Sequence, residues 1–90
     1  MKVLILYRPD SEHATLVETF VRDFEHQHDA LSGKIELLSL NTRDGAAMAS
    51  LYDIWAFPSI LVLGDDGRAL NSWQGEPLPL MAEVAAYAHS

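Results

Sequence analysis

The stretch Ala56-Phe57-Pro58-Ser59-Ile60-Leu61-Val62-Leu63 places a proline between an aromatic residue and an apolar run that is typical of a strand. Proline has no N–H to donate to a strand ladder, so its position at the start of a strand needs an explanation. A cis bond between Phe57 and Pro58 provides one, because it turns the chain tightly and leaves neighbouring backbone groups open to other partners. A cis bond is therefore one interpretation of this proline.

Length and composition limit the classes of protein to which the chain can belong. Its 90 residues, 49% hydrophobic and 21% charged, are typical of a globular protein and argue against disorder. We expect residues 1–90 to form a single domain with one modest core. No apolar run approaches the roughly 18 residues of a membrane span, and Val3–Tyr7 is too short for the core of a signal peptide. These features predict a cytoplasmic protein.

The charge balance and the missing cysteines exclude several functions. Thirteen acidic residues against six basic ones give a formal net charge of −7, which repels nucleic-acid phosphates and anionic lipid, so we expect neither as a partner. Without cysteine the chain forms no disulfide, offers no thiol and cannot bind a metal through sulfur. The four histidines show no metal-ligand spacing, and we expect no metal and no cofactor.

Apolar runs and helical spacings alternate in the order β-α-β-α-β-β-α. Helices between strands favour parallel pairing, and the turn Asp65-Asp66-Gly67 adds an antiparallel hairpin. The fold class expected is therefore α/β, a central four-stranded mixed sheet flanked by helices. The first helix is expected to follow an N-cap at Asp10 or Ser11 and to end before Ser32-Gly33. The other expected elements are strands 2–7, 35–40, 60–63 and 69–73, and helices 46–52 and 80–88.

The core is expected on the apolar faces of these elements. Its expected members are Val3, Ile5, Val17, Phe20, Phe24, Ile35, Leu37, Ile60, Val62, Val84 and Tyr87.

This order of elements, with a proline opening the third strand, resembles the thioredoxin fold. It is similar to the minimal form also seen in glutaredoxins, which lacks the extra N-terminal strand and helix of full thioredoxins. The resemblance covers essentially the whole chain. It is carried by residues 52–63, then Asp65-Asp66-Gly67, then Trp73-Gln74-Gly75.

The redox motif of that family, Cys-x-x-Cys, corresponds here to Ser11-Glu12-His13-Ala14. Ser11 takes the place of the nucleophilic thiol and Ala14 that of the resolving thiol. The buried acid that assists proton transfer in thioredoxins corresponds to Ile5. The resemblance therefore implies a redox-inactive domain, and we expect a binding or scaffold module rather than an enzyme.

In the family, the backbone of the residue before the cis-proline pairs with an extended substrate or with glutathione. The resemblance implies that the Phe57–Pro58 bond is cis, in agreement with a proline that opens an apolar strand, and that the N–H and C=O of Phe57 have the same role. The positions that match the family's substrate site, and that we expect to converge on one groove for a protein or extended peptide, are Asp10, Ser11, Phe57, Pro58 and Gly75.

Other interpretations remain open at this point. Ser11 at a helix N-terminus predicts, as the alternative function, binding of glutathione or another small anion, although the chain has no room for the helical second domain of glutathione transferases. Pro58 can also serve only to shape its turn, with Phe57 packed inward. Trp55 is either a core residue or, if it lies beside the groove, an aromatic anchor for a partner.

Overall fold

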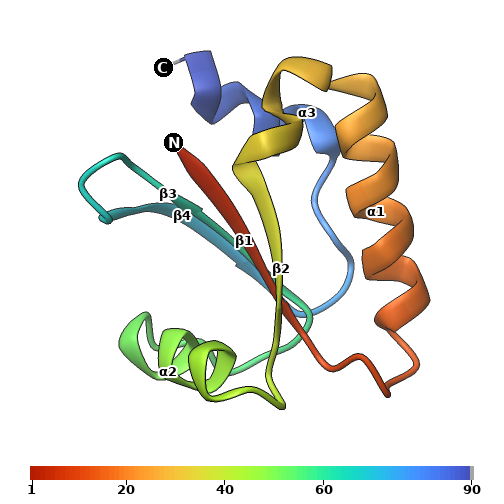
Figure 1. The fold of residues 1–90 in the computed structure, drawn as a ribbon, viewed down its shortest axis with the longest axis vertical. Helices are drawn as coiled ribbons and strands as arrows, with labels where there is room; N and C mark the ends of the chain where they lie inside the picture. The colour runs from red at the N-terminus through yellow and green to blue at the C-terminus, as the bar shows by residue number, and fades with distance from the viewer. Residues whose placement is uncertain (90) are drawn as a thin grey trace.

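A computed structural model describes residues 1–89, and its elements follow the expected order β-α-β-α-β-β-α (Figure 1). Two short 3₁₀ helices, η1 (Asp29–Lys34) and η2 (Ala86–His89), extend the ends of the first and last helices in this part of the chain. The strands are β1 (Lys2–Tyr7), β2 (Ile35–Ser39), β3 (Ser59–Leu63) and β4 (Ala69–Gln74), and the helices are α1 (Ala14–Gln27), α2 (Arg43–Leu51) and α3 (Met81–Ala85).

The four strands form one mixed sheet in the order β2-β1-β3-β4, which confirms the predicted fold class. β1 is parallel to β2 and antiparallel to β3, and β3 is antiparallel to β4. The two central strands are also the two continuous apolar runs, because both of their faces are covered. The pairing of Ser59 with Leu6 and with Gln74 brings the start of β3 beside the ends of β1 and β4.

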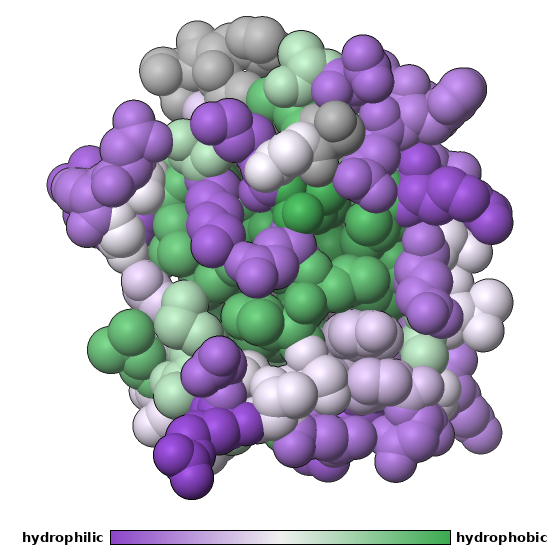
Figure 2. Space-filling view, viewed as in Figure 1, coloured by the Kyte–Doolittle hydropathy of each residue, from purple (hydrophilic) through white to green (hydrophobic). Residues whose placement is uncertain are grey.

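Helices cover both faces of the sheet (Figure 1). α1 and α3 pack on the face that includes Ile5 and Ile60, and α2 packs on the opposite face, against Leu4, Leu6 and Leu61. The alternation of side chains along a strand divides the apolar residues of β1 between the two layers. On the face seen in Figure 2, apolar side chains are exposed in the region between β2 and α1.

The predicted core is confirmed in its central members and corrected at its margin. Phe24 on α1 is fully buried, whereas Phe20 is only partly buried against the same cluster. Phe20 lies at the flank of the buried face, because at 3.6 residues per turn it is rotated about 60° from Val17, which is fully buried like Phe24. The predicted core residues that the structure buries are Val3, Ile5, Val17, Phe24, Ile60, Val62 and Val84, and those that pack on them partly buried are Phe20, Ile35, Leu37 and Tyr87.

α2 begins earlier than the predicted residue 46. Thr42 is its N-cap: the Thr42 hydroxyl accepts a hydrogen bond from the Gly45 N–H at 3.1 Å and donates one to the Ser39 C=O at 2.7 Å. The cap satisfies one of the free N–H groups of the first turn and so extends the helix toward β2. A Cβ on Gly45 would lie 2.0 Å from the Ser39 carbonyl oxygen, so only glycine fits there.

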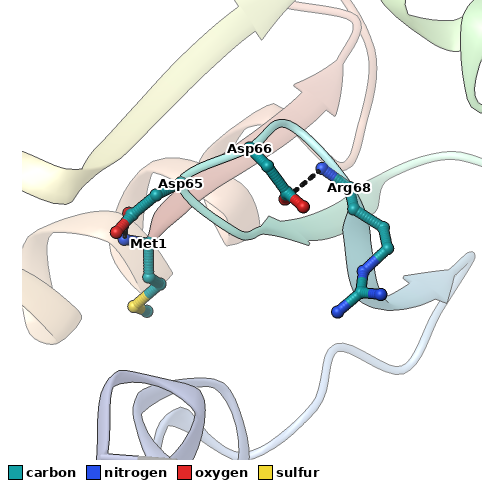
Figure 3. Close-up of polar contacts among 4 residues, drawn as sticks. All are labelled: Met1, Asp65, Asp66 and Arg68. Carbon is teal, nitrogen blue, oxygen red and sulfur yellow. Dashed lines mark hydrogen bonds and ion pairs between the residues drawn. The ribbon is translucent and has the colours of Figure 1, made fainter.

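The β3–β4 hairpin turns through Asp65-Asp66-Gly67, as predicted (Figure 3). The Asp66 carboxylate accepts the N–H of Arg68 at 3.0 Å, and Gly67 has a φ of 83°. The N-terminal ammonium of Met1 donates to the Asp65 carboxylate at 2.6 Å, which ties the start of β1 to this turn. That hydrogen bond and the positive charge of the ammonium lower the pKa of Asp65 below its ordinary value.

Candidate functional site

Three connecting segments meet at one end of the sheet. Residues 8–13 follow β1, residues 52–58 precede β3, and the chain after β4 leaves from Gln74. Since Ser59 is paired with both Leu6 and Gln74, the topology brings all five predicted site residues to this end. The predicted groove is accordingly compatible with the fold, and it stays a prediction as a binding site.

Phe57-Pro58 and Gly75 are joined directly. The Phe57–Pro58 peptide bond is cis, as is the Glu76–Pro77 bond. Pro58 is fully buried, and its C=O accepts a hydrogen bond from the N–H of Gly75 at 2.9 Å. Gly75 has a φ of 79°, which L residues rarely adopt and which glycine adopts readily because it has no Cβ. This bond continues the β3–β4 pairing past the last strand residues.

The Phe57 side chain packs inward while its main chain stays open. Its ring is half-buried against the cluster of Leu6, Ala49 and Ile54 beneath α2. Within residues 1–89 neither the N–H nor the C=O of Phe57 forms a hydrogen bond. The inward packing predicted as one alternative therefore occurs together with backbone groups that form no hydrogen bond within residues 1–89.

The prediction that Asp10 or Ser11 caps the first helix is wrong. α1 begins at Ala14, and its N-cap residue, His13, forms no side-chain cap bond. The Ser11 hydroxyl instead donates to the Arg8 C=O at 2.7 Å, and the Arg8 N–H donates to Nε2 of His13 at 3.1 Å. These bonds close residues 8–13 into a turn, which replaces the expected first helical turn.

These contacts do not place Ser11 and His13 as a nucleophile and its base. Ser11 directs its proton to a carbonyl, and His13 uses Nε2 to accept a backbone N–H. A hydrolytic serine would instead donate its proton to the imidazole. No group of three or more carboxylate or imidazole side chains within residues 1–89 is placed to hold a metal ion.

Trp55 is an exposed side chain at this end of the molecule, so the core interpretation of Trp55 is wrong. It is 80% exposed, yet its position is defined by two hydrogen bonds. Its indole N–H donates to the Asp53 carboxylate at 3.0 Å, and its backbone N–H donates to Oε1 of Gln74 at 2.9 Å. The sequence alone did not identify Gln74 as a site residue. Its side-chain amide bonds Trp55, which lies 19 positions away, and only the register of the strands brings these two residues together.

The charge at this end of the sheet is mainly negative. Arg8 is the one cation among residues 8–12, 53–58 and 74–77, and the carboxylates in those segments are Asp10, Glu12, Asp53 and Glu76.

Comparison with known proteins addresses the fold. No protein-family model matches the chain, and no curated protein matches it. Among solved structures, thioredoxin 1 from the thermophilic eubacterium Thermosipho africanus TCF52B superposes with a TM-score of 0.67 and 10% sequence identity, over 99% of this chain and 91% of that one. The fold is thioredoxin-like. This thioredoxin-like chain has no cysteine, which is consistent with a redox-inactive domain.

Proposed function

We propose that this thioredoxin-like domain binds an extended segment of a partner protein at the Pro58 groove, defined as Asp10, Ser11, Phe57, Pro58 and Gly75. The observation that carries the proposal is the open main chain of Phe57, which forms no hydrogen bond within residues 1–89. An extended peptide satisfies such groups by pairing its own backbone with them. Neighbouring side chains then select the sequence that binds.

The geometry around Phe57 supports a peptide in three ways. The bond from Gly75 to Pro58 fixes the two segments that border Phe57. Gly75 has no side chain to obstruct a ligand backbone. Trp55 adds a large exposed aromatic surface that is already oriented, which reduces the entropy lost on binding.

The structure gives less support to the small-anion alternative at Ser11. Anion binding at a helix N-terminus requires free N–H groups in the first turn. Here the Ser11 N–H and hydroxyl both donate to the Arg8 C=O, and the helix starts three residues later. Four carboxylates in the surrounding segments, Asp10, Glu12, Asp53 and Glu76, also repel an anion.

The proposed setting of this function is the cytoplasm, with a protein partner rather than nucleic acid or lipid. The net charge of −7 supports the exclusion of polyanionic partners. Within residues 1–89, no helix combines the length and the apolar character that crossing a membrane requires.

Peptide selection followed by calorimetry tests the proposal. Peptides selected from a random library on the immobilised domain provide the ligand, and Gly75→Trp is expected to weaken their binding at least about tenfold by filling the groove. Ala82→Trp, which adds the same side chain at an exposed position of α3, is the matched control and should bind normally.

A second measurement covers the case in which Gly75→Trp does not fold. In the unchanged protein, hydrogen exchange of the Phe57 amide should slow when the selected peptide binds. Full affinity in a folded Gly75→Trp variant, or an unaltered Phe57 amide at saturation, would place binding elsewhere.

A further inference from the structure

β2 is an edge strand with an open outer side. It pairs with β1 alone, and its five residue pairs run without a register shift. The N–H of Leu40, directly after the strand, donates to the C=O of Tyr7 in β1 at 2.9 Å. Since successive residues of an extended chain direct their backbone groups to alternate sides, Ile35 and Leu37 direct theirs away from β1.

The opposite edge of the sheet, β4, is protected. Its register with β3 shifts between Val62 and Leu63, which marks an irregularity of the bulge type. The Asn71 side chain accepts the N–H of Ser72 at 2.7 Å and donates to the Tyr87 hydroxyl at 2.7 Å. Bulges and occupied backbone donors are means by which proteins keep an edge from pairing. On β2, Thr42 occupies only the outward C=O of Ser39, at the end of the strand, and there is no register shift. The outward backbone groups of Ile35 and Leu37 carry no such bond, so β2 is the more open edge.

A hollow of about 650 Å³ lies beside β2, between this strand and α1. Figure 2 shows apolar surface in this region, framed by hydrophilic side chains. Val21 and Leu37 supply the apolar lining, and the polar lining is Glu18, Arg22, Glu25, His26 and Asp29.

The rim of the hollow favours cations. Three carboxylates line it, those of Glu18, Glu25 and Asp29, and the guanidinium of Arg22 is the one cationic group among its lysine and arginine side chains. The Nε of Arg22 lies 3.9 Å from the carboxylate of the neighbouring Asp23, which offsets part of its charge. A second copy of this chain brings another net charge of −7, which disfavours self-association on an acidic face. A partner with basic side chains fits better.

We propose that β2 accepts an added strand from a partner protein, in which an apolar residue has lysine or arginine two positions before and after it. Pairing with Ile35 and Leu37 gives the strand its register, and residues two apart then point to the same side. The apolar side chain fills the hollow over Val21 and Leu37, while the cations reach the carboxylates of α1. Glu18 and Glu25 are about 10 Å apart along the helix. The two cations of the added strand are four residues apart, which corresponds to about 13 Å, so each cation can reach one of these carboxylates.

This edge surface is formed by β2 and α1 and is independent of the Pro58 groove. The proposal therefore does not depend on the function proposed above, and the two are tested separately.

Peptide titration followed by NMR-detected hydrogen exchange tests the proposal. The probe is the acetylated and amidated heptapeptide Thr-Lys-Thr-Val-Thr-Lys-Thr, and its counterpart carries glutamate in place of both lysines. We expect the lysine peptide to slow exchange of the Ile35 and Leu37 amides, and the glutamate peptide to leave both unchanged at the same concentration. Because both peptides are tested on the unaltered protein, this result does not depend on the folding of any variant.

Charge variants test the role of the rim. The double variant Glu18→Lys and Glu25→Lys should weaken binding of the lysine peptide at least about tenfold. Glu83→Lys is the matched control, an exposed acid on α3 outside the hollow, and should leave the affinity unchanged. Unaltered Ile35 and Leu37 amides at saturating lysine peptide, or equal binding of both peptides, would overturn the proposal. If exchange of the Ile35 and Leu37 amides slowed with rising protein concentration in the absence of peptide, a second copy of the chain would be the strand that pairs with β2. That result would overturn the proposal as well.

Discussion

The N–H of Gly75 donates to the C=O of Pro58 at 2.9 Å, and this bond joins the end of β4 to the residue that precedes β3. It links two parts of the chain that the sequence separates by a complete hairpin. The open main chain of Phe57 and the oriented ring of Trp55 both lie within three residues of Pro58. The geometry of the candidate site therefore depends on how β3 and β4 are paired.

Gly75→Ala should destabilise the domain by about 1–2 kcal/mol, the usual penalty for a left-handed backbone in an L residue. The space itself is sufficient, since the added Cβ would lie 3.5 Å from the Cβ of Ala56, and the φ of 79° is the cause of the penalty. Urea unfolding measures the effect. Gly33→Ala is the control, because nothing lies within 4 Å of its added Cβ, and an equal loss in both variants would show that the backbone conformation of Gly75 is not responsible.

Phe24→Ala should lower the free energy of unfolding by about 3–5 kcal/mol, because it removes a fully buried ring and leaves a cavity. Phe20→Ala should cost clearly less, since Phe20 is only partly buried. Thermal and urea unfolding of both variants compare them directly. A larger loss in Phe20→Ala would mean that Phe20, and not Phe24, is the more deeply buried of the two rings.

Gly45→Ala should be among the most destabilising single-methyl additions in the chain. The added Cβ would lie 2.0 Å from the Ser39 carbonyl oxygen, so the start of α2 must shift away from β2. We expect a loss of about 1–3 kcal/mol, the usual range for overpacking. Ala47→Ser, at an exposed position of the same helix, is the control. Circular dichroism during urea unfolding measures both, and unchanged stability in Gly45→Ala would contradict the close contact.

Asp65→Asn should remove a pH-dependent part of the stability. The folded-state pKa of Asp65 is lowered by the Met1 ammonium, so the contribution is present above the ordinary aspartate pKa and is lost as the pH falls through the lowered value. The thermal midpoint of the variant should therefore lie below that of the parent at pH 7, and the difference should shrink toward pH 3. Glu83→Gln, which removes an exposed charge elsewhere, provides the control, and a difference that persists unchanged at low pH would exclude this ion pair as its source.

The domain should show no disulfide reductase activity in an insulin turnover assay with an electron donor. The reaction requires a thiolate, and the chain has no cysteine. Ser11 offers a hydroxyl, which is a far weaker nucleophile at neutral pH and here donates to the Arg8 C=O. Turnover above the uncatalysed rate would refute the redox-inactive assignment.

The sequence by itself determined the order of the elements, the fold class and the absence of thiol chemistry. The runs Val3–Tyr7 and Ile60–Leu63 are apolar without alternation, and such runs become central strands because both faces of a central strand are buried. Helical spacing predicted the burial of Val17 and Phe24, because the local periodicity of apolar residues determines which side of a helix can be buried.

Only the tertiary structure decided where α1 starts, that Trp55 is exposed, and that β2 and β4 are the edge strands of the sheet. The turn at residues 8–13 replaces the expected cap because the Ser11 hydroxyl donates to the C=O of Arg8, three residues earlier, instead of accepting an N–H from a later residue. Gln74 orients Trp55 across 19 residues, and the pairing of Ser59 with Leu6 and Gln74 brings the site segments together. Such contacts depend on strand register and on competition among hydrogen-bond partners distant in sequence, which local patterns of residues do not encode.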